Sequence, residues 1–296
     1  MCKKSTLLFI LIFSSSALLS AAQSGNRITI LYDAFGTSTD MIKDWGISAL
    51  IEFNGQRILF DTGNNAEIFA HNVGAAGVDL NDLDFVVVSH RHLDHTAGLN
   101  YLVKVNPAVK IYAPKESFGV FGSNLPSTFY RKKEDLPSRY RYYDGEPPET
   151  MSFGSAWPEG NFEYIENTTE ILPGIHLISL VSDTPGTKEL RELSLVLETA
   201  EGLVVIVGCS HPGVDLIVKE ASTINKHIYL VLGGYHMPTA PDEKIQTVAD
   251  ALMNKFGVEH LAPGHCTGEP AQDIFQKLWG NRYLYSGVGS SIPIPD

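Results

Sequence analysis

The sequence of 296 residues is short of cysteine, of basic side chains and of long apolar runs. Of three cysteines, Cys2 lies in an apparent leader, which leaves Cys209 and Cys266 and limits a mature chain to one internal disulfide. Lys and Arg number 22 against 34 Asp and Glu, for a net charge of −12. We expect no nucleic-acid partner, because general nucleic-acid affinity depends on basic surface.

The N-terminus is typical of a secretory signal peptide over residues 1–22. Lys3 and Lys4 precede an apolar core at residues 7–13, and Ser-Ala-Ala at 20–22 forms a small-residue cleavage site. The apolar run is shorter than the roughly 20 residues of a membrane-spanning helix, and no lipoprotein cysteine follows it. We predict an exported protein without a stable membrane anchor, periplasmic if the source has two membranes. Loss of the two lysines makes its net charge −14.

Four metal-competent side chains lie within six residues of one another: His90, His92, Asp94 and His95. They follow an apolar run that predicts a buried strand, and they precede a predicted helix. In an extended segment His90 and His92 project to the same side, while Asp94 and His95 fall where the chain turns. Imidazole and carboxylate suit Zn, Fe or Mn. This loop could therefore supply two adjacent metal ions; the alternative is a solvated loop rich in histidine.

Three further histidines lie at the ends of predicted strands, each next to glycine or proline: His211, His236 and His265. Side chains on loops that a rigid sheet holds in place are common in functional sites. The remaining four histidines lie within predicted elements or at their starts, and we expect them to be ordinary surface or core residues: His71, His176, His227 and His260.

Both remaining cysteines adjoin a candidate ligand. Cys209 lies two residues before His211, and Cys266 directly follows His265. If these histidines share a metal centre, the thiols are metal ligands, side chains that support the ligands, or a disulfide in an oxidising compartment. A disulfide across such a site would be unusual, which favours the first two roles.

The mature chain, residues 23–296, predicts one domain in which strands and helices recur in two similar halves. Strands are predicted at residues 27–32, 47–53, 57–60, 85–88, 110–112, 174–180, 193–198, 203–207, 228–232 and 258–262, and helices at 66–73, 99–103, 214–223, 242–256 and 271–278. Two such halves back to back predict an α/β fold with four layers, an αββα sandwich.

Residues 115–169 interrupt this pattern with an irregular, aromatic-rich insert. So long an irregular segment is often a lid or a substrate loop, and the alternative is packing against the domain. Within it, residues 131–133 (Arg-Lys-Lys) form a basic cluster that is either a local anion site or a solvated face.

The motif His-x-His-x-Asp-His at residues 90–95 and the Asp-Thr-Gly at residues 61–63 resemble the metallo-β-lactamase superfamily of metallohydrolases. The resemblance covers the chain end to end and implies the αββα metallo-β-lactamase fold. Longer motifs at residues 208–213, 233–236 and 264–268 are similar to the branch of 7,8-dihydropterin-6-yl-methyl-4-(β-D-ribofuranosyl)aminobenzene 5'-phosphate synthase-like proteins.

The resemblance also implies a ligand set, from which the sequence departs at two places. The usual histidine of a Thr-Pro-Gly-His segment is Thr187 here, and Cys209 takes the place of the bridging aspartate. We assign His90, His92 and His211 to one ion, and Asp94, His95 and His265 to the other. Asp61, Cys209 and Cys266 would support these ligands, and His236 would contact the substrate.

The resulting hypothesis is an exported hydrolase with two divalent ions, Zn by preference and otherwise Mn or Fe. A metal-bound hydroxide would attack an ester, lactone or phosphoester, with Asp94 orienting the water and His236 as the acid. The aromatic insert favours an anionic or aromatic small molecule, such as a pterin-like ring. Alternatives are a synthase-type transferase, which export argues against, a non-catalytic metal-dependent binding protein, and a true β-lactamase, which the tail motifs argue against.

Overall fold

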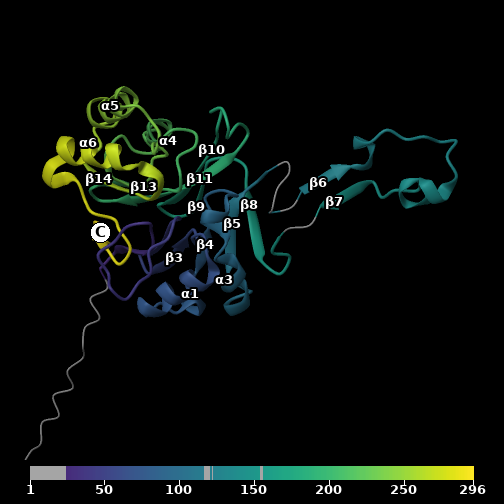
Figure 1. The fold of residues 1–296 in the computed structure, drawn as a ribbon, viewed down its shortest axis with the longest axis horizontal. Coiled ribbons are helices and arrows are strands. Elements are labelled where there is room, and N and C mark those ends of the chain that lie inside the picture. The colour runs from purple at the N-terminus through teal and green to yellow at the C-terminus, as the bar shows by residue number, and fades with distance from the viewer. Residues whose placement is uncertain (1–24, 117–120, 122, 154–155) are drawn as a thin grey trace, which may run out of the picture.

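Two β-sheets face each other, and helices cover the outer face of each sheet (Figure 1). The computed structural model describes residues 25–116, 121, 123–153 and 156–296. The predicted signal peptide, residues 1–22, lies outside these residues and stays a prediction. Among the helices of the described residues, none is long and apolar enough to cross a bilayer.

The first sheet has seven strands in the order β15 (Ser291–Pro293), β1 (Arg27–Tyr32), β2 (Ser48–Phe53), β3 (Gln56–Phe60), β4 (Phe85–Val87), β5 (Lys110–Pro114) and β8 (Asn161–Ile165). Neighbouring strands are antiparallel from β15 to β3 and parallel from β3 to β8. The carboxyl ends of β3, β4 and β5 therefore meet at one edge of this sheet.

The second sheet has six strands in the order β14 (His260–Gly264), β13 (Ile228–Gly234), β12 (Gly202–Val207), β11 (Arg191–Thr199), β10 (Ile175–Val181) and β9 (Thr169–Leu172). The strands β12, β13 and β14 are parallel, and the others are antiparallel. As in the first sheet, three parallel strands deliver their following loops to the same edge.

The layers are held together by three apolar cores. One lies between the sheets and includes Ile51, Phe60, Leu195, Ile206 and Leu230. A second lies between the first sheet and the helices α1 (Ala66–Ala75) and α3 (Leu99–Val105). The third lies between the second sheet and α4 (Val214–Ala221), α5 (Asp242–Asp250) and α6 (Glu269–Trp279). The predicted four-layer αββα sandwich is confirmed.

Local sequence explains most of these elements. Every residue of β12 is buried, as expected for a strand that is covered on both faces. The helix α1 begins after Asn65, whose side chain accepts hydrogen bonds from the backbone of Glu67 and Ile68. The helical segments that complete the chain are α2 (Leu93–Thr96), η1 (Leu80–Asp82), η2 (Ser127–Phe129), η3 (Ser138–Tyr140), η4 (Tyr142–Gly145), η5 (Ala251–Lys255), η6 (His265–Thr267) and η7 (Gly280–Arg282).

The insert at residues 115–169 is less irregular than expected. It contains β8, and β6 (Ser123–Pro126) pairs with β7 (Thr150–Phe153) in an arm that projects from the body beside β8 (Figure 1). The strand β8 was missed because it lies at the edge of its sheet and four of its five residues are partly or fully exposed. Such a strand lacks the strong apolar signal that marks buried ones.

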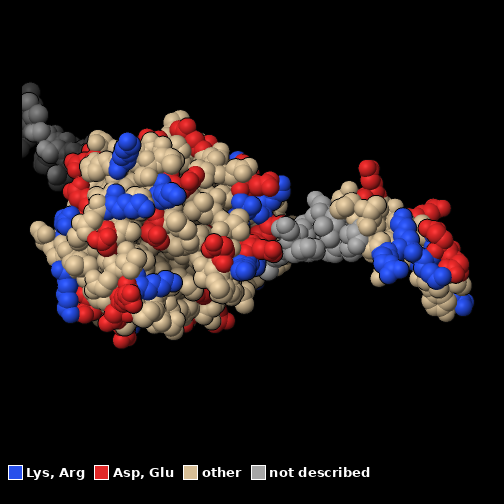
Figure 2. All heavy atoms as spheres, turned by 90° about the horizontal axis from the view of Figure 1, so that it is seen from above, with Lys and Arg blue, Asp and Glu red and all other residues tan. Residues whose placement is uncertain are grey.

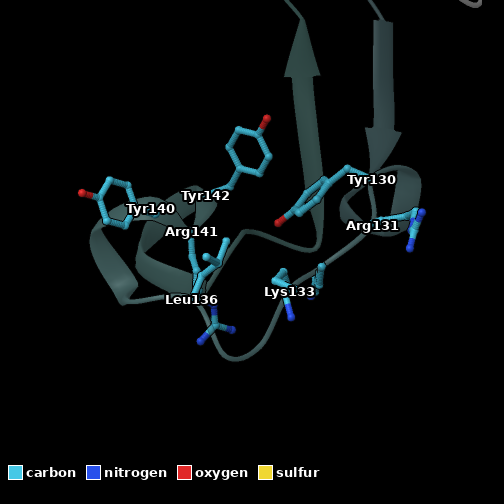
Figure 3. A pocket seen from close by; sticks show the side chains of 9 residues that line it. Tyr130, Arg131, Lys133, Leu136, Tyr140, Arg141 and Tyr142 are labelled. Carbon is cyan, nitrogen blue, oxygen red and sulfur yellow. The ribbon is translucent and has the colours of Figure 1, made fainter.

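Packing against the domain, one of the two roles considered for this insert, applies to its ends, whereas a lid or substrate-loop role for the rest stays a prediction. Near its two ends, Phe121 and Trp157 are buried in the core between the first sheet and the helices α1 and α3. The Trp157 indole donates a hydrogen bond to Asn100 at 3.1 Å. Around the tip of the arm, side chains enclose a hollow of about 90 Å³ (Figure 3), lined by Tyr130, Arg131, Lys132, Lys133, Leu136, Tyr140, Arg141, Tyr142 and Gly145.

The basic residues at this tip are partly neutralised by neighbours. Lys133 pairs with Asp135 at 2.7 Å, and Arg141 pairs with Glu134 at 2.7 Å. Figure 2 accordingly shows basic and acidic side chains together at the end of the arm. These pairs favour the solvated face over a dedicated anion site.

The core between the sheets gives a direct test of the fold. Leu230 on β13 is fully buried, so Leu230→Ala should lower the free energy of unfolding by about 2–5 kcal/mol. Leu216→Ala is the control, because Leu216 lies on α4 with 45 % of its surface exposed, and it should change stability by about 0.5 kcal/mol or less. Urea denaturation measures both, and equal effects would contradict this packing.

Candidate metal centre

Five loops carry the candidate ligands, and each follows a strand. His90, His92, Asp94 and His95 lie between β4 and the end of α2. Cys209 and His211 follow β12, His236 follows β13, and His265 and Cys266 follow β14. Asp61 follows β3. Because these strands are parallel to their neighbours in each sheet, their carboxyl ends bring the loops to one place.

Three imidazoles form the first donor group. The His90 Nε2 atom lies 3.0 Å from the His92 Nδ1 atom and 3.3 Å from the His211 Nε2 atom. Ligands about 2.0–2.1 Å from a tetrahedral zinc ion lie about 3.3 Å apart, so the spacing fits. Burial and the neighbouring His95 hold the pKa of His90 well below its usual value, and burial with the nearby His236 lowers the pKa of His211 to about 3. Both rings are therefore neutral, as metal binding requires.

A mixed second donor group consists of Asp94, His95, Cys209 and His265. The Cys209 Sγ atom lies 3.1 Å from the His95 Nε2 atom and 3.4 Å from the His265 Nε2 atom. The Asp94 Oδ2 atom lies 3.4 Å from His265 Nε2 and 3.7 Å from His95 Nε2. One carboxylate, two imidazoles and one thiol at these separations suit a tetrahedral divalent ion.

The carboxyl group of Asp94 is suited to the ionised form. Burial acts to raise its pKa, but the hydrogen bond with His265 and the charge of His95 outweigh burial and hold the pKa below its usual range.

The two donor groups adjoin each other, with the ring centroids of His90 and His95 4.1 Å apart. The structure therefore contains two adjacent groups of candidate ligands, each of which could hold a metal ion.

Cys209 lies within the second donor group itself, so of the two roles that the sequence favoured, ligand and supporting residue, its position fits the ligand role that the final assignment did not give it. It occupies the position that the resemblance gives to a bridging aspartate, and its thiol replaces that carboxylate. Cys266 is equally buried, with its Sγ atom 3.7 Å from the carbonyl oxygen of Cys209, and with Cys209 and His236 it forms a further group that could hold an ion. Both cysteines are free, so the disulfide alternative does not apply.

A cavity of about 190 Å³ opens beside the first donor group. His211 and His236 form part of its wall, with ring centroids 4.2 Å apart. Lys244 and Asp215 line it as well. His236 is exposed, and its sulfur neighbour Cys266 raises its pKa above the usual value. A small molecule in this cavity would contact His236 next to the metal ligands.

Asp61 holds the loop that carries the four-ligand motif. Its Oδ2 atom lies 2.6 Å from the His95 Nδ1 atom, and its two oxygens accept hydrogen bonds from the Ser89 backbone at 2.7 Å and the Ser89 hydroxyl at 2.6 Å. An imidazole that donates Nδ1–H to a carboxylate presents Nε2 to a metal. Asp61 thus contacts the candidate ligand His95, and its supporting role stays a prediction.

Glu192 holds the loop after β12 in the same manner. It is fully buried, and its carboxyl oxygens accept backbone hydrogen bonds from Cys209 at 2.8 Å, Ser210 at 2.7 Å and His211 at 2.8 Å. Burial raises its pKa to about 7, and the backbone donors oppose that rise. Sequence reasoning missed Glu192, because a single acidic residue in a strand gives no pattern.

Asp33 has the corresponding role for the loop after β14. It accepts a hydrogen bond from the backbone N–H of His265 at 2.9 Å, and burial raises its pKa to about 7.

Strained backbone is concentrated in this centre, since four of its residues have positive φ: Asp61, Ser210, His236 and His265. Such strain persists only where surrounding contacts enforce it.

The four histidines that we expected to be ordinary lie outside both donor groups, although His176 forms a separate, partly exposed group with Glu170 and Glu198 whose donor atoms lie close enough to hold an ion. His176, for example, pairs with Glu198 at 2.6 Å on the second sheet. The seven donors of the two groups include all six residues that the sequence assigned to metal. That these residues bind metal remains a prediction.

Replacement of Glu192 tests how the loop after β12 is held. In Glu192→Gln one oxygen becomes an N–H₂ group that faces backbone donors, so at least one hydrogen bond is lost. We expect the free energy of unfolding to fall by about 1–3 kcal/mol, with weaker metal retention because Cys209 and His211 shift. Thermal unfolding and metal analysis after dialysis measure this. Glu198→Gln is the control on the same strand, with a side chain that is 40 % exposed; a loss of equal size there would contradict the role of Glu192.

Comparisons with known proteins agree with this geometry. The family model of the metallo-beta-lactamase superfamily matches residues 47–265. The 7,8-dihydropterin-6-methyl-4-(beta-D-ribofuranosyl)-aminobenzene-5'-phosphate synthase of Methanocaldococcus jannaschii is 31 % identical over 271 residues, which cover 84 % of this chain and 90 % of that protein. The branch resemblance seen in the sequence is thus confirmed.

Solved structures support the same assignment. A metal-dependent hydrolase of the beta-lactamase superfamily, Tm1679, superposes with a TM-score of 0.68 and 28 % identity, over 92 % of this chain and all of that one. The metallo-beta-lactamase fold protein YhfI from Bacillus subtilis superposes with a TM-score of 0.55 at 13 % identity, over 90 % and 98 % of the two chains, and shows the shared fold. The chain belongs to the metallo-beta-lactamase superfamily.

Proposed function

We propose that this protein is a hydrolase that uses two divalent metal ions to cleave a phosphoester of a small molecule. The observation that carries the proposal is the pair of adjacent donor groups, three imidazoles beside an Asp-His-Cys-His set. Thiolate and imidazole ligands with near-tetrahedral spacing favour zinc over manganese or iron. When bound, such ions supply Lewis acidity and lower the pKa of a coordinated water to about 7.

Two side chains of the protein would orient the water and donate the proton. Asp94, ionised and partly exposed, can accept a hydrogen bond from a water molecule and orient it toward the substrate. His236 borders the cavity and has a raised pKa, so it can hold a proton near neutral pH and give it to a leaving group. These are the two residues proposed as catalytic.

A phosphoester is favoured over a neutral ester or a lactone by the cavity. Lys244 lines the cavity and offers a positively charged partner to an anionic group. The name of the relative from M. jannaschii also includes a phosphate. We therefore extend the proposal to an anionic substrate, with the phosphate beside His236 and Lys244.

A second candidate is a synthase-type transferase that condenses a pterin diphosphate with an aminobenzene riboside. Its support is the 31 % identity with the synthase over most of both chains. The predicted signal peptide opposes it, because both substrates belong to the cytoplasm. A protein that holds an anionic ligand on its metals without turnover is the third candidate, and replacement of the usual bridging carboxylate by Cys209 is the feature that favours it.

Activity assays on zinc-loaded protein without residues 1–22 separate these candidates. We expect hydrolysis of bis(p-nitrophenyl) phosphate, with kcat lowered at least a hundredfold in Asp94→Ala. In His236→Ala, kcat should fall about 10²–10⁴-fold for this proton donor. Asp215→Asn is the control, since it lines the same cavity and has no proposed catalytic role. Condensation of the two synthase substrates without hydrolysis would favour the transferase, and tight phosphate binding without any turnover would favour the binding protein.

A further inference from the structure

The loop between β1 and β2 brings a tryptophan to the second donor group. The Trp45 indole N–H donates a hydrogen bond to the Asp94 Oδ2 atom at 3.1 Å. The same ring lies against His265, with centroids 5.3 Å apart and planes tilted by 59°. Trp45 thus contacts two of the four residues in the Asp-His-Cys-His set.

Close backbone contacts hold the residues that directly follow this tryptophan. The next residue, Gly46, has φ of +138°, and a Cβ atom there would come within 2.5 Å of the Asp94 carbonyl oxygen. The Ile47 N–H donates a hydrogen bond to that carbonyl at 3.4 Å, and the Gly63 N–H donates to Ile47 at 3.0 Å. The loop is therefore held against the ligand loop at Gly46 and Ile47, directly after Trp45.

The outer part of the Trp45 ring faces solvent. Its exposed fraction is 48 %, whereas Trp157 and Trp279 are buried at 4 % and 2 %. Indole is a large apolar surface with a single polar atom, and here that atom already donates to Asp94. The exposed ring can therefore offer only apolar and stacking contacts, directly beside the metal ligands.

We propose that Trp45 acts both as a positioning residue for Asp94 and as an aromatic surface, outside the cavity that His211 and His236 line, against which the ring of an aryl phosphoester packs. This inference rests on the proposed function and names its substrate class more narrowly. Through its N–H, Trp45 holds the Asp94 carboxylate in the orientation that the second ion requires. Through its exposed face, it favours substrates with a planar ring next to the phosphate.

Metal affinity tests the positioning role. Trp45→Phe keeps an aromatic ring but removes the N–H donor, so the Co²⁺ affinity of the Asp-His-Cys-His group should fall about 10–100-fold, as for other groups that orient metal ligands. Affinity of the group formed by His90, His92 and His211, which Trp45 does not contact, should stay the same. Chelator competition gives both values, with Ile42→Ala as the control on the same loop, where the side chain is 43 % exposed. An affinity for the second ion in Trp45→Phe within twofold of the parent overturns this role.

Ligand binding tests whether a substrate ring packs on Trp45, and this test does not depend on turnover. With both sites loaded, we expect Trp45→Ala to bind phenylphosphonate about tenfold more weakly, in line with about 1.4 kcal/mol for one aromatic contact. Binding of methylphosphonate should be unchanged, and Trp45→Phe should restore most of the phenylphosphonate affinity. Calorimetric titration measures the affinity for both ligands. Equal losses of affinity for the two phosphonates, or no loss for either, would overturn the proposed aromatic contact.

The two proposals fail in different ways. If the parent protein binds fewer than two ions, the proposed function is overturned and this inference with it. If the parent protein binds two ions and hydrolyses a phosphodiester, but the Trp45 variants match it in metal and phosphonate binding, only the inference about Trp45 is overturned.

Discussion

The contact between Asp61 and Ser89 is the interaction on which the rest of this centre depends. Both residues are fully buried, and the Ser89 backbone and hydroxyl both donate to the Asp61 carboxylate. The Ser89 carbonyl accepts a hydrogen bond from Leu193 of the second sheet at 2.8 Å, and its side chain lies against Gly208, where a Cβ atom would come within 2.3 Å of its hydroxyl oxygen. At this point the two sheets meet, and the ligand loops of both sheets begin.

Three of the ligand loops around this point are held in the same way, each by hydrogen bonds to one buried carboxylate. Asp61 supports the loop with His95, Glu192 the loop with Cys209 and His211, and Asp33 the loop with His265. Burial of a carboxylate is costly unless hydrogen bonds compensate for the lost water. The hydrogen bonds that position the ligand loops therefore also stabilise the fold. For this reason metal binding and folding should be coupled.

Sequence reasoning found what is local or repeated along the chain. The histidines of residues 90–95 share one short loop, and the other ligands follow apolar strands next to glycine, so strand ends and ligands could be predicted together. Glu192, Asp33 and Trp45 were missed because each acts through a contact distant in sequence: 232 positions separate Asp33 from its partner His265. For the same reason the local pattern did not show that the Cys209 thiol lies among the ligand atoms, because its neighbours His95 and His265 come from other loops.

The central claim is that two adjacent metal sites exist in one chain, and anomalous diffraction from crystals of the zinc-loaded protein at the zinc edge tests it most directly. The account predicts two anomalous peaks per chain, one bounded by His90, His92 and His211 and the other by Asp94, His95, Cys209 and His265. The sulfur of Cys209 should lie about 2.3 Å from the second peak. A single peak, or peaks away from these side chains at full zinc loading, would contradict it.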